Sequence, residues 1–148
     1  MGLGGVAMKL FVLLRIAAIV AFLYALGHTL GMPWVPDEGP ETMAIVQSMA
    51  AHRFDAMGAQ RSMRDFYFGF GISISVFMLA QAILLWLIAG QARLDPERMR
   101  PFIAVLLLAF IANAIIAAMY FFAVPCVMAS IIAICLLVAW IAAKRVAT

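Results

Sequence analysis

Four segments of this chain carry few charged residues and are long enough to cross a membrane. A helix needs about 20 residues to span a hydrocarbon core about 30 Å thick. We place the spans at 8–31, 65–90, 101–124 and 126–143. The whole sequence is 68% hydrophobic and 11% charged, whereas soluble domains are about 45–50% apolar and about 25% charged. These features exclude an ordinary soluble protein and predict an all-α fold, an integral membrane four-helix transmembrane bundle forming a single domain over residues 1–148.

The basic residues are distributed unevenly around the predicted spans. Most of them fall on one side of a four-span protein: Lys9, Arg15, Arg93, Arg98, Arg100, Lys144 and Arg145. The other side carries Arg53, Arg61 and Arg64 and most of the acidic residues. By the positive-inside rule both termini are cytoplasmic, and the 33-residue loop after the first span is outside. A net charge of +3 arranged in this way gives no reason to expect a nucleic-acid partner.

The first loop is predicted to contain a short amphipathic helix. Its opening sequence, MPWVPDEGP, has three prolines and favours an extended segment, in which Trp34 suits an interfacial anchor. Pro40 suits the first position of a helix in PETMAIVQSMAAHRF. Apolar residues recur there at helical spacing: Met43, Val46, Met49, Ala50 and Phe54. This helix is too short to span, so we expect it on or against the outer surface.

Three further signals mark helix ends. Ser62 and Asp65 have the S-x-x-D spacing of a helix N-terminal cap. Asp95 followed by Pro96 has the form of a helix start. Pro125 is expected to separate the third and fourth spans with almost no loop between them.

Polar residues inside the spans need partners. Arg15 lies about two turns deeper than Lys9, so it either snorkels to the headgroups or faces a partner carboxylate or lipid phosphate. Asn113 and Gln81 are expected to hydrogen-bond across helices. A stripe of small and polar residues at four-residue intervals in the second span is expected to face the bundle: Asp65, Gly69, Ser73 and Gln81.

Two motifs carry a family resemblance. GHTLG at the end of the first span and RSMRDFYFGFGISIS opening the second resemble a family of functionally uncharacterised small bacterial four-helix integral membrane proteins. There is a looser similarity to DoxX-like membrane proteins. The resemblance implies the four-span architecture and a bacterial plasma (inner) membrane, and it implies no activity.

Alternating span direction brings polar groups from several helices to one level, near the outer headgroups. This candidate ligand-binding cluster consists of His28, Arg61, Arg64, Asp65, Tyr67 and Tyr120. Ionisable groups at membrane depth are costly and often mark function. Each residue also has a structural interpretation: His28 as the polar end of its helix, Asp65 as a cap, the arginines as lipid-phosphate contacts and the tyrosines as part of an aromatic belt.

We therefore expect a small, non-enzymatic membrane protein that binds lipid or another hydrophobic ligand, or serves as an accessory subunit of a membrane complex. One alternative is a membrane-embedded enzyme acting on a lipid or isoprenoid headgroup through His28 and Asp65; a lower alternative is an oligomeric channel or carrier for small solutes. No metal and no cofactor are expected, because the histidines, His28 and His52, lack ligand spacing. Cys126 and Cys135 lie on opposite faces of one helix and cannot bond each other. The expected partners are membrane lipids, a homo-oligomer or a larger membrane complex.

Overall fold

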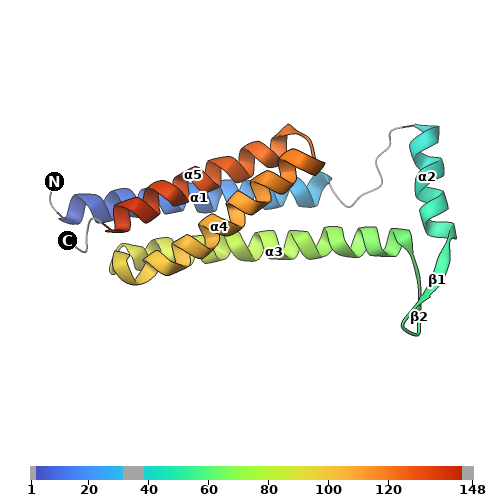
Figure 1. Ribbon diagram of the computed structural model, residues 1–148, viewed down its shortest axis with the longest axis horizontal. Coiled ribbons are helices and arrows are strands. Elements are labelled where there is room, and N and C mark those ends of the chain that lie inside the picture. Colours follow the sequence, from blue (N-terminus) through green and yellow to red (C-terminus); the bar gives the residue numbers. More distant parts are fainter. Residues whose placement is uncertain (1–2, 32–38, 145–148) are drawn as a thin grey trace. The chain divides into compact units, whose positions relative to one another are not determined.

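The computed structural model describes residues 3–31 and 39–144. Its elements follow in chain order: helix α1 (Leu3–Gly31), helix α2 (Pro40–Ala51), strands β1 (Arg53–Ala56) and β2 (Ala59–Ser62), and helices α3 (Met63–Ala92), α4 (Pro96–Tyr120) and α5 (Ala123–Lys144) (Figure 1). The helices α1, α3, α4 and α5 are each long and apolar enough to cross a membrane. The predicted all-α fold with four spans is confirmed. The predicted extended segment with its anchor Trp34 lies outside the described residues.

The chain forms two compact units, residues 1–24 with 78–148 and residues 25–77. We call the first the bundle unit and the second the loop unit. The single domain predicted over residues 1–148 stays a prediction.

The core of the bundle unit is built by all four long helices. Its largest fully buried side chains are Leu10, Leu14, Leu85, Ile103, Ile132 and Leu136. Alanines fill much of the remaining core, which lets the helix backbones approach closely. Many large apolar side chains point outward instead, as expected of helices in contact with lipid. The four long helices therefore carry apolar side chains both on the face that packs in the core and on the face that points to the surroundings.

Helices α4 and α5 form a closely packed antiparallel pair. As predicted, α4 begins at Pro96, where the side chain of Asp95 accepts a hydrogen bond from the Arg98 N–H at 3.1 Å. The break between the two helices differs from the prediction, because it lies at residues 121–122 and Pro125 is the third residue of α5. A proline is tolerated there, since backbone N–H groups in the first turn of a helix have no partner within that helix.

A polar contact joins α1 to α4 in the bundle unit. The Tyr24 hydroxyl of α1 hydrogen-bonds the side chain of Asn113 of α4. The prediction that Asn113 bonds across helices is thus confirmed, and such a contact is worth on average about 0.6 kcal/mol in a membrane.

Helix α2 of the loop unit begins at Pro40, as predicted, and its cap residue Gly39 has φ +96°. That φ is readily adopted only by glycine, which lets the chain turn into the helix. Met43, Val46, Met49 and Ala50 of the predicted apolar stripe are half-buried, and the rest of the helix is mostly exposed. The helix ends at Ala51, so Phe54 belongs to β1 rather than to α2.

A two-stranded antiparallel hairpin follows α2, which the sequence did not lead us to expect. Strands β1 and β2 pair from Arg53 with Ser62 to Ala56 with Ala59. The two residues of the turn, Met57 and Gly58, both have positive φ, 54° and 88°, as a type I′ turn requires. The Asp55 carboxylate accepts a hydrogen bond from the Gly58 N–H at 2.8 Å and closes this turn.

Candidate functional site

Asp65 of the predicted cluster caps helix α3. Its carboxylate accepts a hydrogen bond from the Ser62 N–H at 2.8 Å, and the Asp65 N–H donates to the Ser62 hydroxyl at 3.2 Å. This reciprocal pair is a capping box. Arg53 and Arg61 of the hairpin lie near enough to interact favourably with the same carboxylate. The capping predicted for Ser62 and Asp65 is confirmed, and it satisfies this carboxylate without any ligand.

The remaining cluster residues of this region are exposed. Arg61 lies on β2 and donates from Nη1 to the Gln60 carbonyl at 3.0 Å. Arg64 and Tyr67 lie in the first two turns of α3. The structure thus gathers Arg61, Arg64, Asp65 and Tyr67 around the start of α3.

His28 contacts α3 further along the helix than Asp65. Its Nδ1 lies 3.1 Å from the Ser75 hydroxyl oxygen. The Ser75 hydroxyl also contacts the Gly71 carbonyl of its own helix, at 3.3 Å. Ser75 follows Asp65 by ten residues, which is about 15 Å along a helix. His28 is therefore bonded well away from the capping carboxylate with which the enzymatic alternative would pair it.

Tyr120 is the last residue of α4, and it is exposed. It belongs to the bundle unit, whereas the five other cluster residues belong to the loop unit. The predicted residues accordingly belong to three parts of the chain: the start of α3, the contact of His28 with Ser75, and the end of α4.

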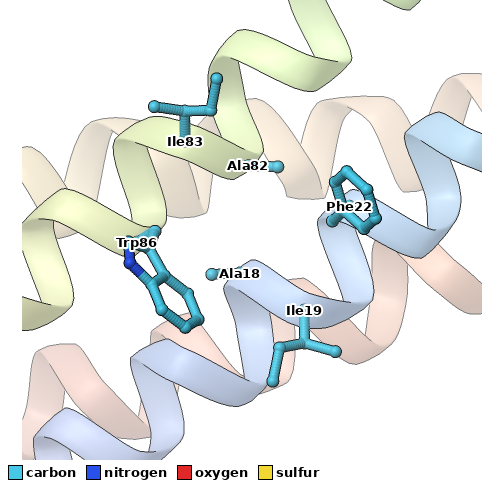
Figure 2. Close-up of a pocket in the computed structure, with 6 residues that line it drawn as sticks. All are labelled: Ala18, Ile19, Phe22, Ala82, Ile83 and Trp86. Atoms are coloured by element: carbon cyan, nitrogen blue, oxygen red, sulfur yellow. The ribbon is translucent and has the colours of Figure 1, made fainter.

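The bundle unit has a groove between α1 and α3 that the sequence did not reveal (Figure 2). It has a volume of about 260 Å³ and is lined by Ala18, Ile19, Phe22, Ala82, Ile83 and Trp86. Ala18 and Ala82 are buried, and the larger residues around them are about half exposed. Figure 2 shows the two small side chains between the larger ones, so the groove exists because both helices place an alanine at its floor.

A cation lies directly beside this groove. Arg15 of α1 places its guanidinium carbon Cζ 3.4 Å from the ring centroid of Trp86, and 5.0 Å from that of Phe11. Cation–π contacts of this kind contribute up to about 2 kcal/mol when desolvated. Arg93 lies over Phe11 as well, with Cζ 5.7 Å from its centroid.

The hydrogen-bonding groups of Arg15 are not satisfied by these rings. Its Nε and Nη1 atoms are buried and have no hydrogen-bond partner among the residues described. A buried donor left without an acceptor costs about 1–3 kcal/mol, and native structures leave few such groups. Snorkelling and a lipid-phosphate contact of Arg15 stay predictions, and its nearest partners among the residues described are aromatic rings.

The position of Trp86 could have been inferred from the sequence. Trp86 lies six residues from the end of α3 at Ala92, and Arg15 lies eight residues from Ala7, where the first candidate span begins. Counting residues from the span ends therefore places both side chains at a similar depth.

Metal-binding side chains do not gather in the described part of the chain, where no group of three or more His, Cys, Asp or Glu residues could hold an ion. Cys126 and Cys135 are both free thiols.

Comparison with known proteins found no matching family model, no matching curated protein and no matching solved structure. Function must therefore be argued from the residues themselves.

Proposed function

We propose that this four-span membrane protein is a non-enzymatic binding protein, and that the groove between α1 and α3 holds the hydrocarbon chain of a lipid. The observation that carries the proposal is the groove itself, which is wholly apolar in its lining residues and ends at Trp86 beside Arg15. Ligand sites are typically apolar hollows with a few polar groups that fix orientation.

The size of the groove favours a chain over a compact ligand. Its volume of about 260 Å³ is below the range of about 300–1,000 Å³ typical of small-molecule pockets. It is open on one side, and its walls are side chains that a membrane protein presents to lipid. One stretch of acyl chain lying along the helices suits this shape.

The polar residues give less support to catalysis. Asp65 is engaged in the capping box, and His28 bonds Ser75 about 15 Å further along α3. An acid–base pair would need both side chains within hydrogen-bonding reach of one substrate.

We place the protein in a bacterial plasma membrane with both termini in the cytoplasm, on the basis of the family resemblance and the positive-inside rule. Lipids are then its principal partners. A homo-oligomer or a larger membrane complex, to which the protein would be accessory, remains compatible with lipid binding.

The proposal can be tested by filling the groove. Ile83 lines it and is 53% exposed, whereas Ile134 of α5 is 62% exposed and does not line it. Ile83→Trp and Ile134→Trp are therefore matched substitutions. After mild extraction and native mass spectrometry, we expect bound phospholipid on the wild-type protein and on Ile134→Trp, and at least a fivefold lower occupancy on Ile83→Trp. Equal occupancy in the two variants, or a lipid-free wild-type protein, would overturn the proposal. Copurification of a larger complex without lipid would favour the accessory role instead.

A further inference from the structure

The guanidinium of Arg15 can bind through its flat face and through the N–H groups at its edge. The described residues contact only the face. The face of its guanidinium lies on Trp86 and its other neighbour is the Phe11 ring. Its N–H groups, however, point outward in the guanidinium plane, and a ring stacked on the face accepts none of them. Nε and Nη1 are the two atoms that are buried without a partner. Protein atoms cover these two nitrogens, whereas Nη2 is not buried and has no hydrogen bond to a described residue, so it is the nitrogen that can meet an acceptor from outside.

The surroundings favour an anion as this acceptor. Arg93 lies over the same phenyl ring as Arg15, so two positive charges flank one aromatic side chain. The sequence of the bundle unit contains seven lysines and arginines but only two acids, Asp95 and Glu97. The Asp95 side chain already caps α4. The unit thus carries a positive charge that its own carboxylates do not balance.

Depth in the membrane identifies the kind of anion. Arg15 follows Ala7, the start of its candidate span, by eight residues, or about 12 Å of helix. Water is scarce at such a depth, and arginines there draw lipid phosphates inward. A charge-assisted hydrogen bond from an arginine N–H to a phosphate oxygen is about twice as strong as a neutral one. A phospholipid whose chain lies in the groove would bring its phosphate to this end of it.

We infer that Arg15 binds the phosphate of an anionic phospholipid whose acyl chain occupies the groove between α1 and α3, with Trp86 holding the guanidinium in place. This inference rests on the proposed function and adds headgroup selectivity to it. Arg93 contributes a second positive charge, which favours a headgroup of net negative charge over a zwitterionic one.

Arg100 provides an internal comparison. Its Cζ lies 4.4 Å from the Trp140 ring centroid, and its Nε is also buried without a described partner. Trp140 does not line the groove between α1 and α3. The Arg15 pair combines an unsatisfied guanidinium with a place for a chain.

The test uses Trp86 as a reporter in the full-length protein. Trp34→Phe and Trp140→Phe leave it as the single tryptophan. The protein is reconstituted in vesicles of brominated phosphatidylcholine, whose chains quench indole fluorescence on contact. Unbrominated phosphatidylglycerol or phosphatidylcholine is then added, and recovery of fluorescence measures the relative affinity of each lipid for the site.

We expect phosphatidylglycerol to restore fluorescence at an about fivefold lower mole fraction than phosphatidylcholine, the effect of about one basic side chain on an anionic lipid. Arg15→Gln should remove this preference. Arg98→Gln, which removes the same charge from an exposed position, should retain it.

The outcomes separate the two proposals. Fluorescence that brominated phosphatidylcholine does not quench would overturn chain binding itself. Quenching that both added lipids relieve equally would overturn only the headgroup inference, and this comparison does not depend on whether Arg15→Gln folds. A preference that survives Arg15→Gln but disappears in Arg98→Gln would assign the selectivity to general surface charge and would also overturn the inference.

Discussion

The guanidinium of Arg15 lies on the indole ring of Trp86, with 3.4 Å between Cζ and the ring centroid. This contact links α1 to α3 within the bundle unit and places a positive charge at one end of an apolar groove. A desolvated cation is costly unless it is compensated, and the indole face supplies part of that compensation. The contact is thus both a source of stability and a means of positioning Arg15.

Replacing Trp86 should therefore show whether its aromatic ring, or only its apolar volume, stabilises the protein. We expect Trp86→Leu to lower the free energy of unfolding by about 1–2 kcal/mol through loss of the cation–π contact. Trp86→Phe, which retains an aromatic face, should cost clearly less. Titration with a denaturing detergent measures both. Equal losses would show that the ring contributes only its apolar volume.

His28 and Ser75 should be energetically coupled. In a double-mutant cycle with His28→Ala and Ser75→Ala, we expect a coupling energy of about 0.5–1 kcal/mol for their hydrogen bond. The matched cycle of His28→Ala with Asp65→Asn should be additive within about 0.5 kcal/mol, because the two sites share no partner. Strong coupling in the second cycle would revive the His28–Asp65 pair of the enzymatic alternative.

The capping box should control the start of α3. Ser62 is 2% exposed, and we expect Ser62→Ala to cost about 1 kcal/mol, as is usual for loss of a cap. Hydrogen exchange of the first-turn amides of α3 should be faster in this variant and in Asp65→Asn. Glu41→Gln, in the first turn of α2, is the control and should leave those amides unchanged. Protection that is equal in all three variants would contradict the assignment.

The hairpin turn carries strain that one substitution can relieve. Met57 has φ +54°, a conformation that costs most residues about 1–2 kcal/mol and that asparagine adopts more readily. Met57→Asn should therefore stabilise the hairpin, whereas Gly58→Val, at φ +88°, should destabilise it. Hydrogen exchange of the amides of β1 and β2 reports both effects, and slower exchange in Gly58→Val than in the wild-type protein would be inconsistent with this turn.

The sequence predicted those features that depend on long or strongly local signals. Apolar length alone located the four spanning helices, and Pro40, Asp95 and the Ser62–Asp65 pair marked helix starts that the structure confirms. These signals work because each is set by backbone chemistry within a few residues.

The hairpin was missed because its sequence has weak strand signals. Its strands, RFDA and AQRS, are four residues long and contain no β-branched residue. Its turn is Met57–Gly58 rather than the Asn-Gly or Asp-Gly that marks such turns in a sequence.

The buried stripe of α3 was misplaced because it was sought at strict four-residue intervals. Gly69 and Ser73 of the expected stripe are exposed. The buried positions instead follow alternating steps of three and four that match 3.6 residues per turn: Met78, Ala82, Leu85, Ala89 and Ala92.

Counting residues from the span ends also did not predict the contact of His28 with Ser75, because such a count ignores how far helices are offset along their axes. Helix α3 has 30 residues, or about 45 Å, well beyond a hydrocarbon core of about 30 Å. Residues at its start therefore lie far from the level at which His28 meets Ser75. Contacts between helices depend on their axial offset, which no single span encodes.

The most direct test of lipid binding in the groove is photochemical capture of a lipid that stays bound when the protein is extracted from its membrane. Phe22 lines the groove and is 47% exposed, and Phe102 of α4 is 54% exposed and lies outside it. Each is replaced in turn by p-benzoylphenylalanine, and the protein is extracted in mild detergent, irradiated and weighed by mass spectrometry. We predict that the Phe22 position gains the mass of one phospholipid while the Phe102 position captures detergent. Capture of detergent alone at both positions would contradict the account.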